Sequence, residues 1–119
     1  MTDAPGGTLI HLNPILNVTD LNASITFYTE NLGFELLHSF GDPPNFAIIS
    51  RTGHEIYLCE QGQGQPGTWL GLFVTDPAAL YAHLVTNDVK VLLAPKADGG
   101  EFRVEDPDSH VLRIFAASE

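Results

Sequence analysis

The feature that most constrains this chain is its match to itself at one fixed shift of 56 positions. The matched pairs are Asp20 with Asp76, Glu35-Leu36-Leu37 with Val91-Leu92-Leu93, Phe46 with Phe102, and His54 with His110. A repeat of this length cannot bury its apolar face alone, so two copies of one supersecondary unit must share a core. The space that the two copies enclose is the natural place for a binding site.

Hydrophobic periodicity and turn residues predict the same order of elements in both halves: a strand, a helix and three strands. In the first half these lie at Leu9–Val18, after the N-cap Asp20 as far as Gly33, and near Phe34–Phe40, Asn45–Ser50 and Glu55–Glu60. In the second half they lie at Thr68–Thr75, after Asp76-Pro77, and near Val89–Leu93, Glu101–Glu105 and Val111–Phe115. We therefore predict an α+β fold in which two βαβββ units form a curved mixed-sheet cup with the helices outside.

The predicted domain organisation is simple. Residues 1–7 contain Pro5, Gly6 and Gly7 and are expected to be a mobile lead-in. Residues 8–117 are expected to form a single domain, with units at about 8–60 and 68–116. Residues 61–67 are rich in Gly, Gln and Pro but lack the lysine of a P-loop, so they are predicted to be a linker.

The charge balance excludes one class of partner. Fifteen acidic residues and five basic residues give a formal net charge of −10, which repels phosphate backbones, so we expect no nucleic-acid partner. The same field attracts cationic ligands, although an acidic surface also serves solubility.

The sequence also suggests a compartment. It has no apolar run of the roughly 18 to 20 residues that cross a bilayer, and residues 1–7 lack the pattern of a signal peptide. Its single cysteine, Cys59, excludes an internal disulfide framework. We expect a cytoplasmic protein that does not contact a membrane.

Several short motifs follow one another in a specific order along the chain: Val18-Thr19-Asp20-Leu21, Ser24, Phe27-Tyr28, Leu32-Gly33-Phe34 and Glu105-Asp106-Pro107-Asp108. In this order they resemble the vicinal oxygen chelate superfamily, which includes glyoxalase I, extradiol dioxygenases, and fosfomycin- and bleomycin-resistance proteins. Asn13-Pro14-Ile15-Leu16 and Glu101-Phe102-Arg103-Val104 are most similar to the bleomycin-resistance branch. The resemblance covers Leu9 to Phe115. It implies a homodimer, in which each cup is completed by halves of both subunits, sometimes through strand exchange.

The resemblance also implies where a metal would be bound. Metal-dependent members hold a divalent ion with four inward side chains, and the motifs carry these positions over to Asn13, Tyr57, Trp69 and Arg113. Divalent ions need neutral imidazoles or anionic oxygens, whereas an indole only donates a hydrogen and a guanidinium is cationic. We expect no metal and no other cofactor.

A shifted metal site stays open at this point. His11 shares a strand face with Asn13, and Glu55 shares one with Tyr57, so His11 and Glu55 are the candidate ligands if the register differs. His54 and His110 lie at an odd separation from the ligand positions and are predicted to point to the opposite face. Each histidine is expected to be a turn or surface residue.

With no metal, the predicted cup is an apolar pocket with a few polar groups, which suits a planar or aromatic small molecule. The expected ligand-binding residues are Asn13, Ile15, Asn17, Glu55, Tyr57, Trp69, Phe73, Arg113 and Phe115. Trp69 either stacks on an aromatic or cationic guest or merely fills the former metal cup. A half-buried Arg113 needs a partner, which is either Glu55 or another carboxylate, or an anionic ligand.

Three functions compete. The first is a non-catalytic binder of the bleomycin-resistance type that sequesters a hydrophobic, cationic or aromatic compound. The second is an enzyme, either a lyase or dioxygenase with a relocated metal site or a metal-free isomerase with Glu55 as base. The third is a structural or interaction module whose cup is filled by its own side chains.

Overall fold

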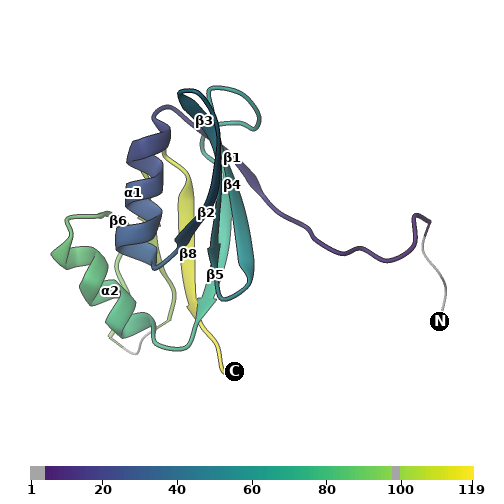
Figure 1. Ribbon diagram of the computed structural model, residues 1–119. Helices are drawn as coiled ribbons and strands as arrows, with labels where there is room; N and C mark the ends of the chain where they lie inside the picture. Colours follow the sequence, from purple (N-terminus) through teal and green to yellow (C-terminus); the bar gives the residue numbers. More distant parts are fainter. Residues whose placement is uncertain (1–4, 98–99) are drawn as a thin grey trace.

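The computed structural model describes residues 5–97 and 100–119, so the expected lead-in lies partly outside the described residues. The first half contains β1 (Ile15–Val18), α1 (Leu21–Leu32), β2 (Glu35–Gly41), β3 (Pro44–Arg51) and β4 (His54–Glu60). The second contains β5 (Trp69–Val74), α2 (Pro77–Thr86), β6 (Lys90–Leu93), β7 (Phe102–Glu105) and β8 (Val111–Ala116). The predicted α+β class and the two βαβββ units are confirmed (Figure 1). Neither described helix has the length and apolarity to span a membrane.

The strands form two four-stranded mixed sheets with equivalent topology. Sheet A has the order β1-β4-β3-β2 and sheet B the order β5-β8-β7-β6. Strand β1 pairs in parallel with β4, with Ile15 beside Tyr57, and β5 pairs in parallel with β8, with Gly71 beside Arg113. These two residue pairs are related by the shift of 56 positions, which confirms the predicted match of the first and last strands between the halves.

Both helices begin as the sequence predicts. The side chain of Asp20 accepts a hydrogen bond from the backbone N–H of Ala23 at 3.1 Å, and Asp76 does the same for Ala79 at 3.1 Å. These caps satisfy N–H groups that have no partner within the helix. Helix α1 ends at Gly33, whose φ of 71° is in the left-handed region that glycine adopts without strain.

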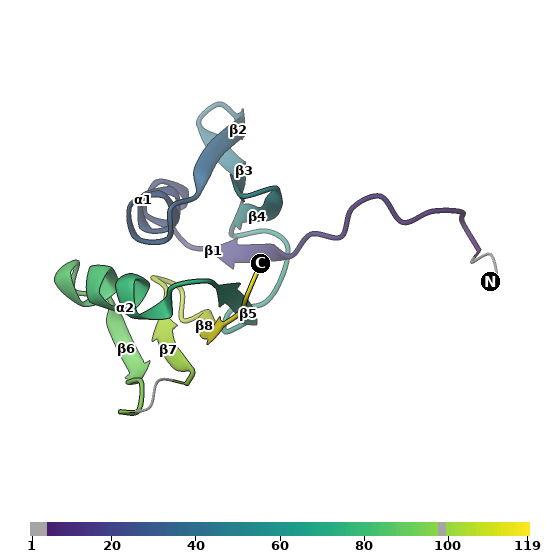
Figure 2. The ribbon, with the colours of Figure 1, turned by 90° about the horizontal axis from the view of Figure 1, so that it is seen from below.

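One hydrophobic core joins the two halves. Figure 2 shows the sheets diverging from β1 and β5, with both helices inside the angle between them. The buried cluster draws on both sheets and both helices: Leu16, Val18, Leu21, Tyr28, Leu32, Phe34, Ala47, Ile49, Ile56, Leu58, Leu84, Phe102, Val104, Leu112 and Ile114. Each sheet therefore covers the core with one face, and we call the opposite face, which lies away from the helices, its outer face.

The first predicted strand is much shorter than expected. Strand β1 covers only Ile15–Val18, and residues 5–12 run away from the body of the molecule as an arm (Figure 1). Leu9, Ile10 and Leu12 are 73%, 74% and 80% exposed. The register places Tyr57 of β4 beside Ile15, so β4, which begins at His54, is too short to pair with residues before 12. Residues 9–11 therefore have no strand to pair with in the described chain.

The predicted match of Phe46 with Phe102 is wrong by one residue. Ala47 pairs with Leu58 in sheet A, and its structural counterpart Phe102 pairs with Ile114 in sheet B. Phe46 is half-buried on an outer face, whereas Phe102 is buried in the core. The cause is the connection between β7 and β8: residues 106–110 separate the pair Glu105–Val111, but only residues 51–54 separate the corresponding pair Ser50–Glu55.

Candidate functional site

The outer face of sheet B carries the aromatic residues predicted for the site. Side chains alternate along a strand, so Trp69, Gly71 and Phe73 of β5 share the face opposite to the core residues Leu70 and Leu72. Trp69 is 55% exposed and Phe73 is 66% exposed. The neighbouring strand β8 adds Phe115, whose ring stacks on Phe73 at a centroid distance of 4.8 Å.

Arg113 lies in the middle of this face and is paired with a carboxylate. Its Nε and Nη2 atoms donate to the two oxygens of Glu101, both at 2.8 Å. Arg103 donates to the same carboxylate at 3.2 and 3.1 Å. The partner of Arg113 is therefore Glu101 rather than Glu55. Glu101 directly precedes β7 of sheet B, whereas Glu55 is on β4 of sheet A.

The ion cluster formed by Glu101, Arg103 and Arg113 changes the pKa values of its members. Hydrogen bonds from Arg113 and then from Arg103 lower the pKa of Glu101 from 4.5 to about 2. The bond to Glu101 raises the pKa of Arg113. Both guanidiniums also lie over aromatic rings, with Cζ of Arg103 5.4 Å from the Trp69 centroid and Cζ of Arg113 4.9 Å from that of Phe115. Charge and aromatic surface are thus interleaved on this face.

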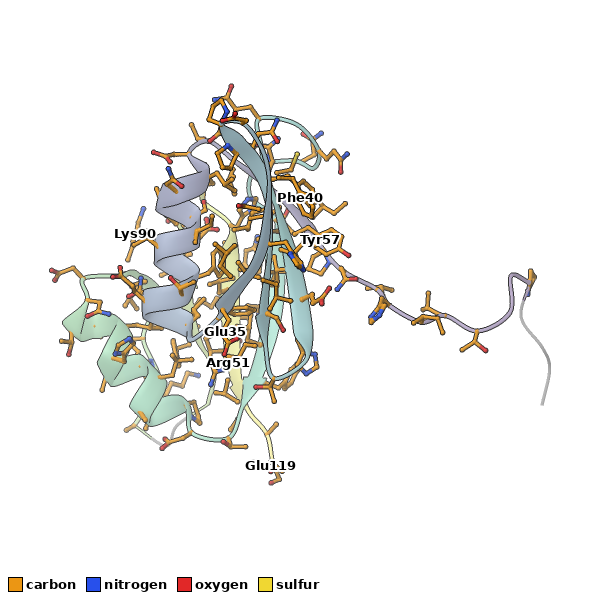
Figure 3. The ribbon with its side chains drawn as sticks, viewed as in Figure 1. Glu35, Phe40, Arg51, Tyr57, Lys90 and Glu119 are labelled. Carbon is orange, nitrogen blue, oxygen red and sulfur yellow. The ribbon has the colours of Figure 1, made fainter. Side chains whose placement is uncertain are left out.

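The outer face of sheet A carries the remaining predicted residues. Tyr57 lies on the side away from α1, as does Phe40 (Figure 3), and its ring contacts Phe46 edge-on at 5.6 Å. The amide of Asn13 donates to the backbone oxygen of Glu55 at 3.2 Å. This face therefore offers a phenol, amides and the Glu55 carboxylate beside exposed apolar groups.

The structure does not bring all nine predicted residues together within one chain. Asn13, Ile15, Asn17, Glu55 and Tyr57 belong to sheet A or precede it, and Trp69, Phe73, Arg113 and Phe115 belong to sheet B. The two outer faces turn away from each other on either side of the apex at β1 and β5 (Figure 2). A hollow of about 490 Å³ does occur elsewhere, between the end of α1 and α2, but none of the nine residues lines it.

The residues at the superfamily's ligand positions do not fit a divalent metal. The Trp69 indole can only donate, and the Arg113 guanidinium is cationic and already bonded to Glu101. The neutral amide of Asn13 and the neutral phenol of Tyr57 are weak metal ligands. Among residues 5–97 and 100–119, no three His, Cys, Asp or Glu side chains are grouped as a metal site would require. We therefore derive no chemical step through a metal.

Sequence reasoning missed a buried polar cluster between the halves. His110, expected in a turn or at the surface, is fully buried. Its Nδ1 accepts from the backbone N–H of Thr68 at 2.9 Å, so Nε2 carries the proton and donates to the backbone oxygen of Asn17 at 2.7 Å. The imidazole thereby joins β1 to the start of β5. The fixed tautomer indicates a structural role, because neither ring nitrogen is available to a ligand.

Asp106 and Asp108 extend the same cluster, whose only signal in the sequence was the Asp106-Pro107-Asp108 motif. Asp106 accepts from the buried Tyr28 hydroxyl at 2.7 Å, and Asp108 accepts from the Thr19 hydroxyl at 2.6 Å. Burial, and then the charge of Asp106, raise the pKa of Tyr28 well above 10.0 and keep it a donor. The β7–β8 connection thus fastens the second half to α1 and to the residue Thr19 that precedes it.

Comparisons with known proteins agree with this architecture. The model of the family described as the Glyoxalase/Bleomycin resistance protein/Dioxygenase superfamily matches residues 8–114. TioX from Micromonospora sp. ML1 superimposes with a TM-score of 0.79 at 17% identity, covering 90% of this chain and 98% of that chain. No curated protein matches the chain.

Two further solved structures are similar. A protein of unknown function from Agrobacterium tumefaciens has a TM-score of 0.71 and 25% identity, and covers 96% of this chain and 98% of its own. A mutant of the fosfomycin resistance protein FosX from Listeria monocytogenes, complexed with Mn(II) and dihydroxypropylphosphonic acid, has a TM-score of 0.71 and 19% identity, with coverages of 89% and 90%.

Proposed function

The chain belongs to the Glyoxalase/Bleomycin resistance protein/Dioxygenase superfamily, and from this premise we propose that it is a metal-independent small-molecule-binding protein of the cytoplasm. The ligand is a planar or aromatic compound, and sequestration of a drug is the biological role that this activity would serve. The observation that carries the proposal is the outer face of sheet B, where the exposed rings of Trp69 and Phe73 flank the fixed guanidinium of Arg113. The side chains at the four superfamily metal positions suit an organic guest better than a metal ion, and this supports the proposal further.

We propose that the binding unit is a homodimer. A small-molecule site needs a concave surface, but the two outer faces diverge within one chain. A second copy that placed its sheet A opposite sheet B of the first would close two equivalent cups, related by two-fold symmetry. The faces are complementary in charge, since Glu55 lies on one and Arg113 on the other. Their large exposed apolar residues also favour burial, among them Ile15, Phe40, Trp69 and Phe73.

Fluorescence titration tests ligand binding directly, because Trp69 is the only tryptophan of the chain. We expect a planar aromatic drug of the bleomycin class to change Trp69 emission in a saturable way. Trp69→Phe should weaken binding measured by calorimetry by about three- to tenfold, through loss of stacking area. An unchanged signal at high drug concentration, together with no heat of binding, would count against this ligand class.

A second candidate function is catalysis within the same superfamily, as a lyase or dioxygenase with a relocated metal or as a metal-free isomerase. The structural likeness to a fosfomycin resistance protein that was solved with Mn(II) supports it. Elemental analysis of protein purified without chelator distinguishes the two functions. A stoichiometric transition metal that is lost on His11→Ala or Glu55→Gln would favour the enzyme.

A further inference from the structure

We propose that the ligand of the sheet B face is a planar aromatic carboxylate, whose acid group binds Arg103 and Arg113 while its ring packs on the neighbouring aromatic side chains. The inference rests on the proposed function, because it assigns a charge and a binding mode to the same site. It also reverses the expectation, drawn from the net charge, that the guest is a cation.

The first observation is an excess of positive charge at the centre of the face. Arg103 and Arg113 are register partners on adjacent antiparallel strands, an arrangement in which like charges repel. Glu101 lies between them and accepts four hydrogen bonds of 2.8 to 3.2 Å from the two guanidiniums. Among residues 5–97 and 100–119, this one carboxylate is the hydrogen-bonded partner of two guanidiniums and neutralises only one of the two positive charges. The described part of the face therefore keeps one positive charge, although the molecule as a whole is strongly acidic.

The second observation is that both guanidiniums keep hydrogen-bonding capacity. Each carries five N–H donors, and each uses only Nε and Nη2 to bind Glu101. Within residues 5–97 and 100–119, no hydrogen bond is formed by Nη1 of either side chain. The side chains of Arg103 and Arg113 are 32% and 37% exposed. A second carboxylate can therefore reach donors on both without first removing Glu101.

The third observation is the arrangement of rings around these donors. Trp69 lies on the side of Arg103, and the stacked pair Phe73 and Phe115 lies on the side of Arg113. Gly71 is directly beside Arg113 in the ladder, and a Cβ atom there would meet the Phe115 and Phe73 rings at 3.6 and 3.7 Å. Without a side chain at Gly71, these two rings pack directly over the β5 backbone beside Arg113, so the guanidinium lies next to a continuous aromatic surface.

The experiment compares three ligands of one shape and different charge. The full-length protein is titrated with 2-naphthoate, its neutral amide and 2-naphthylmethylammonium, by calorimetry and by Trp69 fluorescence. We expect the acid to bind about tenfold or more tightly than the amide, because charge-assisted hydrogen bonds are the stronger ones. The cation should bind most weakly.

Two variants with opposite expected effects make the test specific. Arg113→Gln should weaken binding of the acid at least about tenfold while changing the amide much less. Glu101→Gln should strengthen binding of the acid, because it releases both guanidiniums from their internal partner. Lys96→Gln removes one charge at an exposed position between β6 and β7 and is the control for net charge. Circular dichroism confirms that each variant is folded.

The outcomes separate the two proposals. Equal binding of all three ligands, or a cation that binds best, overturns the acid assignment and leaves small-molecule binding in place. A loss of acid affinity in Glu101→Gln, or none in Arg113→Gln, also overturns it. If none of the three ligands binds, both the acid assignment and the proposed aromatic site fail.

Discussion

His110 is the residue on which the joint between the halves depends most directly. It is fully buried, and both of its ring nitrogens are bonded to the backbone, one to Thr68 on the strand β5 side and one to Asn17 of β1. Its repeat counterpart His54 is exposed at the start of β4. Two positions that match in the sequence have therefore acquired entirely different roles.

The first prediction concerns this pair of histidines. His110→Ala should lower the free energy of unfolding by about 3 kcal/mol, because it leaves two backbone groups without partners and creates a cavity. His54→Ala should change it by less than about 0.5 kcal/mol, as expected at an exposed position. Urea denaturation of both variants measures the difference. Equal stabilities of the two variants would refute the structural role of the imidazole.

The second prediction concerns pH and Glu101. Its pKa is lowered from 4.5 to about 2, so the stability it contributes is fully present above pH 4.5 and is lost as the pH falls through about 2. At pH 3.5 the carboxylate should still be ionised while ordinary glutamates are largely protonated. Carbon-detected NMR titration of the glutamate carboxyls tests this. In Arg113→Gln, the pKa of Glu101 should move back toward 4.5.

At the scale of elements, sequence reasoning succeeded where local chemistry dominates. The two N-caps, Gly33 and the equivalence of the pair β1–β4 with the pair β5–β8 at a shift of 56 all follow from residue type and from the repeat. It failed where an element depends on a partner elsewhere. Leu9 to Pro14 have strand-like composition, yet β4 begins at His54 and is too short to reach residues 9–11.

The one-residue difference between the halves could not be read from the sequence either. A shift of 56 relates Leu58 to Ile114, but a shift of 55 relates Ala47 to Phe102. Both shifts leave apolar residues in matching places, so the pattern alone does not choose between them. The extra residue in the β7–β8 connection is what lets Asp106 and His110 reach the other half.

The third prediction concerns the linker as an element. Gly64 has a φ of 86°, and a Cβ atom there would lie 2.8 Å from the backbone oxygen of Ile15. Gly67 has a similar φ of 78° but no atom within 4 Å. Gly64→Ala should therefore destabilise the fold by at least about 1 kcal/mol more than Gly67→Ala, since both share the backbone strain and only the first adds a clash. Thermal and urea unfolding of the two variants provide the comparison.

At the scale of the whole molecule, one core serves two sheets, and the surfaces that the resemblance assigns to a ligand are turned outward. Eight of the nine candidate residues lie on the first and last strands of each half, and Asn13 lies just before β1. Their division between two diverging faces does not follow from the residue pattern, which is the same for a cup closed within one chain and for a cup closed between two. Only the family resemblance implied cups that are completed by halves of two subunits.

The fourth prediction tests the proposed dimer. Phe73→Asp places a charge at the centre of the outer face of sheet B and should shift the protein from dimer to monomer in sedimentation velocity experiments. Val85→Asp introduces the same charge on α2, where Val85 is 47% exposed, and should leave the dimer intact. A wild-type chain that sediments as a monomer at all concentrations would exclude the proposed arrangement.

The polar bonds that fasten the β7–β8 connection to β1 and α1 have a genetic consequence. These bonds fix the two halves of one polypeptide with their outer faces pointing away from each other. Each pocket of the proposed dimer is therefore formed by sheet A of one molecule and sheet B of the other. A copy defective only at Tyr57 and a copy defective only at Trp69 should then complement each other when co-expressed. A mixed dimer would contain one pocket with both defects and one intact pocket. Random pairing of equal amounts makes about half of the dimers mixed, so about a quarter of the wild-type binding capacity would return from two inactive parents.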